Sequence, residues 1–111
     1  MADTLLPPAL LHRAARRFKL LSDPTRLELL NCLHVKGESS VQDLARATGH
    51  SQANVSKHLL LMAREGMLSR RKDGLHVRYA IQDPTLSNLC NVVCGQIQQE
   101  IQDLAGLAGA G

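Results

Sequence analysis

Apolar side chains recur every three or four positions along the first third of the chain. From Leu10 to Leu21 they share one side of an amphipathic pattern with cations on the other, which predicts a helix there. Asp23 followed by Pro24 supplies an N-cap and a proline in the first helical position. We therefore expect a second helix to begin there and to run to about Val35.

Two shorter helical patterns follow. Ser40 begins a pattern typical of a capping box, and Gly49 is typical of a helix end. Ser51 is placed to cap the next helix, which should end near Gly66. Residues 40–65 are therefore predicted to form a helix-turn-helix.

Residues 67–81 alternate between apolar and polar side chains on both sides of Asp73-Gly74, which is a turn signal. This pattern predicts a β-hairpin. A helix-turn-helix followed by such a wing places one helix in the major groove of DNA. The expected fold is mainly α with a small β-hairpin, a winged helix-turn-helix.

A long amphipathic pattern occupies residues 83–104. The chain has 111 residues with one tyrosine, one phenylalanine and no tryptophan, so a single domain over residues 1–111 should have a small aliphatic core. This stripe is longer than such a core can cover, so we expect the helices over 10–21 and 83–104 to form a homodimer interface. The small residues 105–111 are expected to be disordered.

The second helix of the helix-turn-helix has two faces. Val55, Leu59 and Met62 share one stripe and should face the core, and His58 lies near that stripe, which favours a structural role for it. Leu60 points outward for no evident reason. The opposite face and the first turn carry small, amide and cationic side chains suited to base edges and phosphates, namely Gln52, Ala53, Asn54, Ser56 and Lys57.

The hairpin carries a second set of candidate DNA contacts. They are Arg70, Arg71, Lys72, His76 and Arg78. Such cations on a wing can follow the phosphate backbone or enter the minor groove. All 13 Lys and Arg lie between Arg13 and Arg78, whereas the rest of the chain after this stretch is weakly acidic. This distribution favours DNA contact by the middle of the chain and protein contact by its last helix.

Other classes of protein fit the sequence less well. It has no apolar run of about 18 residues and no signal-peptide pattern, so we expect a cytoplasmic protein without a membrane partner. It has no nucleophile motif or oxyanion loop, so we expect no enzyme, and no constitutive cofactor is indicated. The competing class is a winged helix that binds protein or membrane, and the basic wing counts against it.

Three segments together resemble the ArsR/SmtB family of dimeric winged-helix repressors: FKLLSDPTRLELLNCL, SQANVSKHL and RRKDGLHVRY. The resemblance covers roughly residues 13–100 in unbroken order. It implies four helices, two strands and a fifth helix, with the first and last helices at the dimer interface and the fourth reading DNA. It also implies a repressor that binds an inverted repeat in double-stranded operator DNA and releases it when an inducer binds.

Two of the family's inducer sites have no counterpart here. The arsenic-type site has two cysteines in the third helix, but residues 38–44 read ESSVQDL and contain no thiol. The zinc-type site uses Asp and His pairs in the last helix, which here has Asp83 but no histidine. The inducer site must therefore be sought elsewhere in the chain.

Three cysteines are the remaining candidates. Cys90 and Cys94 are one helical turn apart, so their Cβ atoms should lie about 6 Å from one another on one face. Together with Cys32 they would offer three thiolates. Three sulfurs suit trivalent arsenic or antimony, and soft thiolates also select Cu(I), Zn(II) or Cd(II). We therefore favour an inducer site formed by Cys32, Cys90 and Cys94.

Two other interpretations of the thiols stay open. Cys32 resembles in position the second-helix cysteine of the family's persulfide-sensing members, which implies a redox or reactive-sulfur switch between Cys32 and Cys90 or Cys94. The last-helix thiols lie about a turn or more earlier here than in those members. Alternatively, all three cysteines are small side chains that only pack, because free cysteine is among the most buried residue types.

Overall fold

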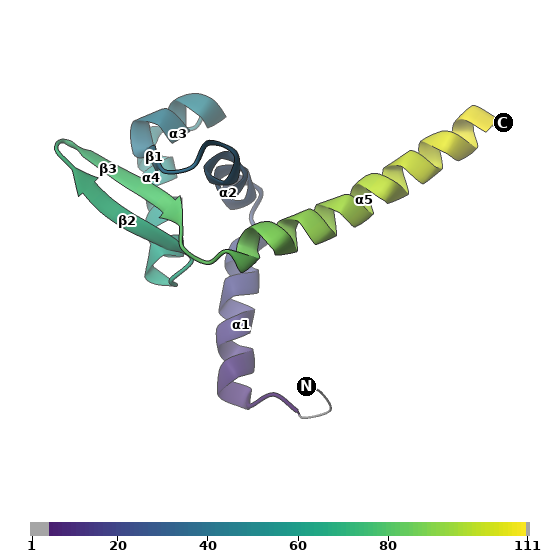
Figure 1. The fold of residues 1–111 in the computed structure, drawn as a ribbon, viewed down its shortest axis with the longest axis horizontal. Coiled ribbons are helices and arrows are strands. Elements are labelled where there is room, and N and C mark those ends of the chain that lie inside the picture. The colour runs from purple at the N-terminus through teal and green to yellow at the C-terminus, as the bar shows by residue number, and fades with distance from the viewer. Residues whose placement is uncertain (1–4, 111) are drawn as a thin grey trace.

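The computed structural model describes residues 5–110 and has the helix order that the sequence predicted, with one additional short strand (Figure 1). The fold is mainly α with a small antiparallel hairpin. In chain order the elements are α1 (Pro8–Leu21), α2 (Pro24–Lys36), β1 (Ser39–Ser40), α3 (Val41–Thr48), α4 (Gln52–Arg64), β2 (Leu68–Asp73), β3 (His76–Ile81) and α5 (Thr85–Ala110).

Side-chain caps determine where three of the helices begin, as the sequence indicated. Asp23 Oδ1 accepts a hydrogen bond from the backbone N–H of Arg26 at 3.1 Å at the start of α2. Ser40 and Ser51 cap α3 and α4 in the same way, each with a hydrogen bond of 3.1 Å. Gly49 ends α3 with φ 79°, a left-handed conformation that is costly for other residues. The helix-turn-helix is therefore present as predicted.

The wing is confirmed as a hairpin, but the sheet also contains a strand that the sequence analysis did not predict. β2 and β3 pair antiparallel along their whole length. Ser39 of β1 lies opposite Tyr79 of β3, and Ser40 lies opposite Arg78, which gives the strand order β1-β3-β2. Two residues are too few to show an alternating pattern. β1 joins the connection between α2 and α3 to the wing.

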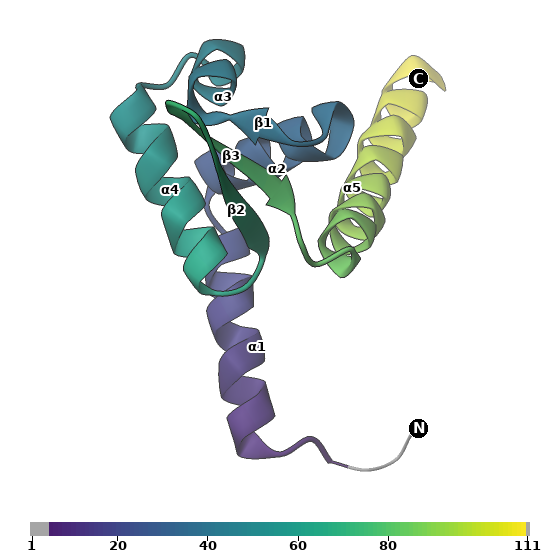
Figure 2. The same ribbon diagram turned by 60° about the vertical axis from the view of Figure 1, so that its left-hand side comes forward.

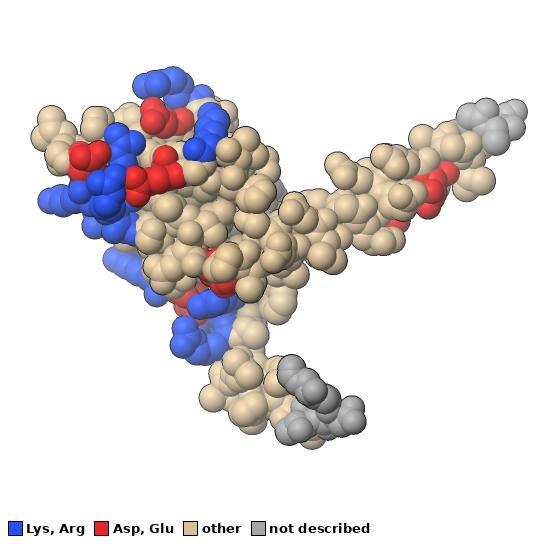
Figure 3. All heavy atoms as spheres, viewed as in Figure 1, with Lys and Arg blue, Asp and Glu red and all other residues tan. Residues whose placement is uncertain are grey.

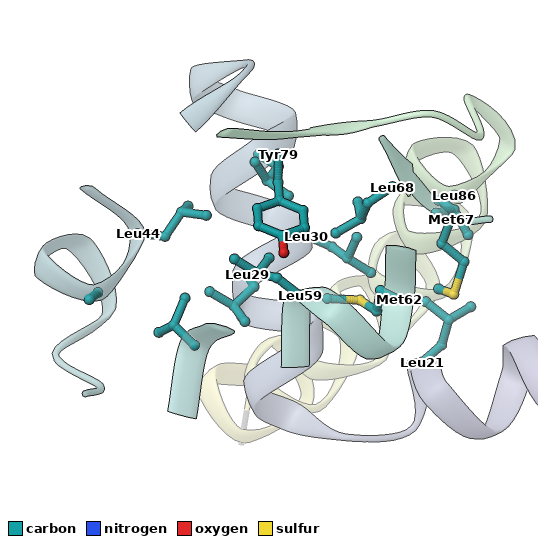
Figure 4. Close-up of a cluster of buried hydrophobic side chains, with 13 residues drawn as sticks. Leu21, Leu29, Leu30, Leu44, Leu59, Met62, Met67, Leu68, Tyr79 and Leu86 are labelled. Carbon is teal, nitrogen blue, oxygen red and sulfur yellow. The ribbon is translucent and has the colours of Figure 1, made fainter. Parts of the chain in front are cut away.

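The core lies where α2, α3 and α4 meet the sheet, and it is almost entirely aliphatic (Figure 4). Val55, Leu59 and Met62 of α4 are fully buried, which confirms the predicted stripe. Tyr79 of β3 belongs to the same cluster and is 2% exposed. Its hydroxyl accepts a hydrogen bond from Arg70 Nε at 3.3 Å, so the polar atom of this buried ring is satisfied.

α1 and α5 extend away from this core as two arms (Figure 1, Figure 2). Leu21 is the buried member of α1, and Leu86 in the first turn of α5 is buried as well. Most of the other large apolar side chains of the two arms are exposed, namely Leu10, Leu11, Phe18, Val92, Val93, Ile97, Ile101, Leu104 and Leu107. Apolar surface of this extent is typical of helices that are covered by another chain.

The expected disorder of residues 105–111 is wrong for residues 105–110, because α5 continues to Ala110; residue 111 lies outside the described residues. Alanine and leucine favour helix, and Leu107 continues the apolar stripe three residues after Leu104. The small residues therefore extend the arm, although their composition suggested a loop. Even so, no helix within residues 5–110 combines the length and the apolar character needed to cross a membrane.

Arg17 joins both arms to the helix-turn-helix. Its Nη1 donates to Asp83 Oδ2 at 2.9 Å just before α5, and its Nη2 donates to the carbonyl oxygen of Glu65 at 3.4 Å at the end of α4. Arg16 also pairs with the Glu65 carboxylate, with 3.4 Å between Nε and Oε1. These contacts connect α1, the end of α4 and the residue pair before α5 near one point.

Replacing Leu59 with alanine should lower the free energy of unfolding by about 2–5 kcal/mol, because Leu59 is fully buried and its truncation leaves a cavity. Leu61 on the same helix is 38% exposed, so Leu61→Ala should cost about 1 kcal/mol or less. Urea unfolding of both variants at one protein concentration measures the difference. Equal losses would contradict the orientation of α4.

Candidate nucleic-acid interface and thiol pocket

α4 presents to solvent the residues that the sequence assigned to DNA contact. Gln52, Ala53 and Lys57 are exposed, and Asn54 and Ser56 are half-buried. They lie in the first turn and on the side away from the buried stripe, because successive helical residues rotate by about 100°. The N-terminal half of α4 thus offers amide, hydroxyl and ammonium groups, which can bond to base edges and phosphates.

His58 has the structural role that its position predicted. It is 8% exposed, and its Nδ1 accepts a hydrogen bond from Arg26 Nη1 at 3.2 Å. Burial lowers the pKa of His58, which favours the neutral ring that this contact requires. The contact links α4 to the start of α2. Leu60, expected to point outward, is half-buried in the structure.

Among the described residues, two arginines of the wing are paired with carboxylates, whereas its lysine is not. Arg71 Nη2 donates to Glu38 Oε1 at 2.6 Å, and Arg78 Nε donates to Asp73 Oδ2 at 2.8 Å. Hydrogen bonds from these arginines lower the pKa of Glu38 and of Asp73, so both carboxylates stay ionised. Lys72 makes no ion pair with any described residue. A DNA phosphate must displace a carboxylate before it can bind Arg71 or Arg78. Lys72 can bind a phosphate without breaking an ion pair to a described residue.

The charges of the molecule are separated in space. Arg70 and His76, which complete the predicted wing set, are both exposed. Figure 3 shows Lys and Arg side chains over the wing, near α3 and on α1, and none on the α5 arm. The last cation in the chain is Arg78, before α5 begins. The surface that carries the exposed end of α4 and the wing is therefore the basic one.

A second candidate site is a pocket between α2, the end of β3 and the first turns of α5. Its volume is about 180 Å³. Cys90 and Cys94 both line it, with Cys90 half-buried and Cys94 exposed. Its apolar wall consists of Leu27, Leu30, Ile81 and Leu86. The structure thus brings the two α5 thiols together at one opening, as their spacing predicted.

Cys32 does not join this pair within one chain, contrary to the expected three-sulfur site. The face of α2 toward the pocket is formed by Leu27, Leu30, Asn31 and His34. Cys32 lies well outside that face, because residues rotate by about 100° each along a helix, and it packs beside the core. Within residues 5–110, no set of three or more His, Cys, Asp or Glu side chains is close enough to hold a metal ion.

The surroundings of Cys90 disfavour its thiolate form. Burial raises the pKa of the Cys90 thiol, and the nearby charge of Cys94 raises it further. Both effects favour the protonated thiol at neutral pH. A soft ion that binds there must displace protons, so its affinity should increase with pH.

The contribution of α2 to this pocket was not predicted from the sequence. Leu27, Asn31 and His34 recur at intervals of four and three residues, so they share a helical face. That spacing was available in the sequence. The element that packs opposite this face is α5, and the approach of α5 is a property of the tertiary structure.

Comparisons with known proteins support the fold and the family. A family model described as HVO_A0114 matches residues 21–81. The HTH-type transcriptional regulator YgaV of Escherichia coli is 33% identical over 86 residues, which cover 74% of this chain and 87% of YgaV. A probable mercury resistance operon repressor of Streptomyces lividans is 40% identical over 75 residues, covering 68% of this chain and 59% of that protein.

The arsenical resistance operon repressor of Escherichia coli is 42% identical over 64 residues, which cover 58% of this chain and 55% of that protein. The chain therefore spans less than two thirds of the length of the mercury and arsenical repressors that it matches.

Solved structures extend the similarity to nearly the whole chain. The antimony-specific repressor AntR superposes with a TM-score of 0.82 at 29% identity, covering 92% of each chain. A homodimeric winged helix-turn-helix DNA-binding domain from Mycobacterium bovis superposes with a TM-score of 0.74 at 29% identity, covering 89% of this chain and 92% of that one. The Mycobacterium bovis protein is described as a possible ArsR-family transcriptional regulator. In sequence over more than half of its length and in fold over almost all of it, the chain belongs to the ArsR/SmtB family of winged helix-turn-helix regulators.

Proposed function

We propose that the chain is a DNA-binding transcriptional repressor that acts as a homodimer and leaves its operator when a soft metal or metalloid ion binds its thiols. The observation that carries this proposal is the arrangement of α4, which buries one stripe and exposes its polar N-terminal half beside a basic wing. Relatives with the same fold are named as repressors of mercury and arsenical resistance operons and as an antimony-specific repressor.

DNA recognition is assigned to α4 and the wing. α4 enters the major groove by its N-terminus, where the amides of Gln52 and Asn54 are suited to pair with base edges. Lys57 and the wing cations contact phosphates, which position the protein and make binding dependent on salt. Arg71 and Arg78 exchange their carboxylate partners for phosphate during this step.

The two arms are assigned to the dimer interface. Their exposed apolar side chains need a cover, and the Mycobacterium bovis neighbour is homodimeric. A twofold dimer places two copies of α4 on one side of the molecule, so its operator is an inverted repeat with half-sites about one helical turn apart.

The inducer is assigned to Cys90 and Cys94. Soft thiolates select ions such as trivalent arsenic and antimony, mercury or cadmium. Three relatives are named for mercury, arsenical or cadmium resistance, and AntR is named as antimony-specific. Cys32 adds a third sulfur only if dimer formation brings it to the pair. A disulfide switch between Cys32 and α5 needs the same approach, because a disulfide requires Cα atoms within about 7 Å.

Release of DNA follows from the position of the pocket. α2 belongs to the body that holds α4, whereas α5 belongs to an arm, so an ion bound between them changes their separation. Arg17 transmits the change to the end of α4 through Glu65. A coupling free energy of about 1–3 kcal/mol would lower operator affinity by about five- to 150-fold.

Replacing Lys72 with alanine should weaken the binding of a duplex selected for tight binding and of a random duplex by a similar factor, because the ammonium group contacts phosphate and not bases. Because both subunits of the dimer carry the change, two phosphate contacts are lost, and the slope of log affinity against log salt concentration should fall in magnitude by about 2. Anisotropy titrations at several salt concentrations measure both quantities. Lys19→Ala on α1 is the matched control, and a slope unchanged by Lys72→Ala would exclude this residue from the interface.

Cys90→Ser and Cys94→Ser should each abolish the release of the selected duplex by antimonite or arsenite, because either change leaves a single thiolate in the pocket. Cys32→Ser should still respond, since Cys32 lies outside that pocket. The measurement is duplex binding by each reduced variant with and without the ion. A response lost only in Cys32→Ser would replace this site with one centred on α2.

A further inference from the structure

The pocket beside the α5 thiols contains more apolar surface than a bare ion needs. Leu30 and Leu86 are 3% and 4% exposed and line its inner part, whereas Cys94 lies at its exposed edge. Cys90 is half-buried, so its exposure is intermediate between that of these leucines and that of Cys94. A ligand that reaches both sulfurs therefore has an apolar space behind it and not only solvent.

The number of sulfurs limits the chemistry of that ligand. Trivalent arsenic forms three single bonds, and only two thiols line the pocket. With inorganic arsenite, the third bond would hold a hydroxyl group. A hydroxyl directed at the polar part of the lining, which consists of Asn31, His34, Ser87 and Asn91, would gain a hydrogen bond. A hydroxyl directed at Leu27, Leu30 and Ile81 would lose its hydration without gaining one, which is unfavourable. An organic substituent on the third bond would instead bury apolar surface.

We infer that the pocket is a binding site for trivalent arsenicals that carry one organic substituent, with arsenic bonded to Cys90 and Cys94 and the substituent against the apolar wall. This inference rests on the inducer site of the proposed function and specifies its ligand class. A pocket of about 180 Å³ is large enough for a phenyl group, because cavities of about 150 Å³ lined by similar side chains bind benzene.

The binding step is a condensation and needs no oxidant. An arsonous acid, which has one carbon substituent and two hydroxyl groups on arsenic, reacts with two thiols. Two As–O bonds break and two As–S bonds form, and each thiol proton leaves with a hydroxyl group as water. Arsenic stays trivalent and both sulfurs keep their oxidation state.

Mercury(II) is the main alternative occupant, because it also takes two thiolates. It binds them in a line with no further substituent, so it makes no use of the apolar wall. Comparing an aryl arsenical with arsenite and mercury(II) therefore tests the wall and the thiol pair separately.

The first experiment is intact-protein mass spectrometry of the reduced chain with phenylarsonous acid, in the absence of DNA. Wild type and Cys32→Ser should each gain one phenylarsenic group with the loss of two waters. Cys90→Ser and Cys94→Ser should not form this product at the same concentration. A product that persists in either α5 variant, or that is lost in Cys32→Ser, would overturn the inference.

The second experiment compares affinities by competition with a small dithiol. Phenylarsonous acid should bind at least tenfold more tightly than arsenite. Leu27→Ala should weaken phenylarsonous acid about fivefold and leave arsenite and mercury(II) unchanged, because part of the apolar wall is lost. Val35→Ala is the matched control, since Val35 is an exposed residue of α2 outside the pocket. Arsenite binding as tightly as the phenyl compound, or equal effects of both variants, would contradict the inference.

These measurements test the arsenical pocket and the proposed repressor function separately. Adduct formation without DNA tests only the pocket, whereas duplex release tests the proposed repressor. A protein that binds phenylarsonous acid but no duplex would contradict the proposed function alone. A protein whose duplex is released by arsenite and mercury(II) but that shows no preference for the phenyl compound would contradict this inference alone.

Discussion

The burial of one stripe of α4 is the constraint on which the rest of the structure depends. Val55, Leu59 and Met62 are fully excluded from water and pack into a core that also contains Tyr79 of the wing. A helix can bury only one face in this way, so the rotation of α4 about its axis is determined by the core. The polar face is then directed to solvent, beside the sheet that carries the basic wing.

The arms differ from α4, because most of their large apolar side chains are exposed. α1 and α5 leave the core after Leu21 and Leu86 have been buried, and the apolar residues beyond these positions have no cover within one chain. The arms therefore contribute little to the core of a single chain. Their exposed apolar surface is suited to association with a second chain. Arg17 links the two arms to the rest of the fold, because this residue of α1 donates both to the carbonyl oxygen of Glu65 at the end of α4 and to Asp83 just before α5.

The thiol pocket lies between the core and one of the arms. One side is α2, held rigidly by the core, and the other is α5, held mainly at its first turns. A ligand in that position contacts a fixed body and an arm at the same time, so its binding free energy depends on their separation. Such a dependence is the physical requirement for coupling between two sites.

Local signals in the sequence were sufficient for all five helices and the hairpin, and for most of their limits. Asp23, Ser40 and Ser51 cap helices through neighbours three residues away, and the stripe on α4 follows from helical periodicity. Local signals did not predict three features of the structure. These are the strand Ser39–Ser40, the helical conformation of residues 105–110 and the separation of Cys32 from the α5 thiols. For the strand and the thiols, the outcome depends on which elements meet across the fold, and spacing within one element does not contain that information. Periodicity placed Cys90 and Cys94 on one face, but only the packing of α2 against α5 decided that the third thiol faces elsewhere.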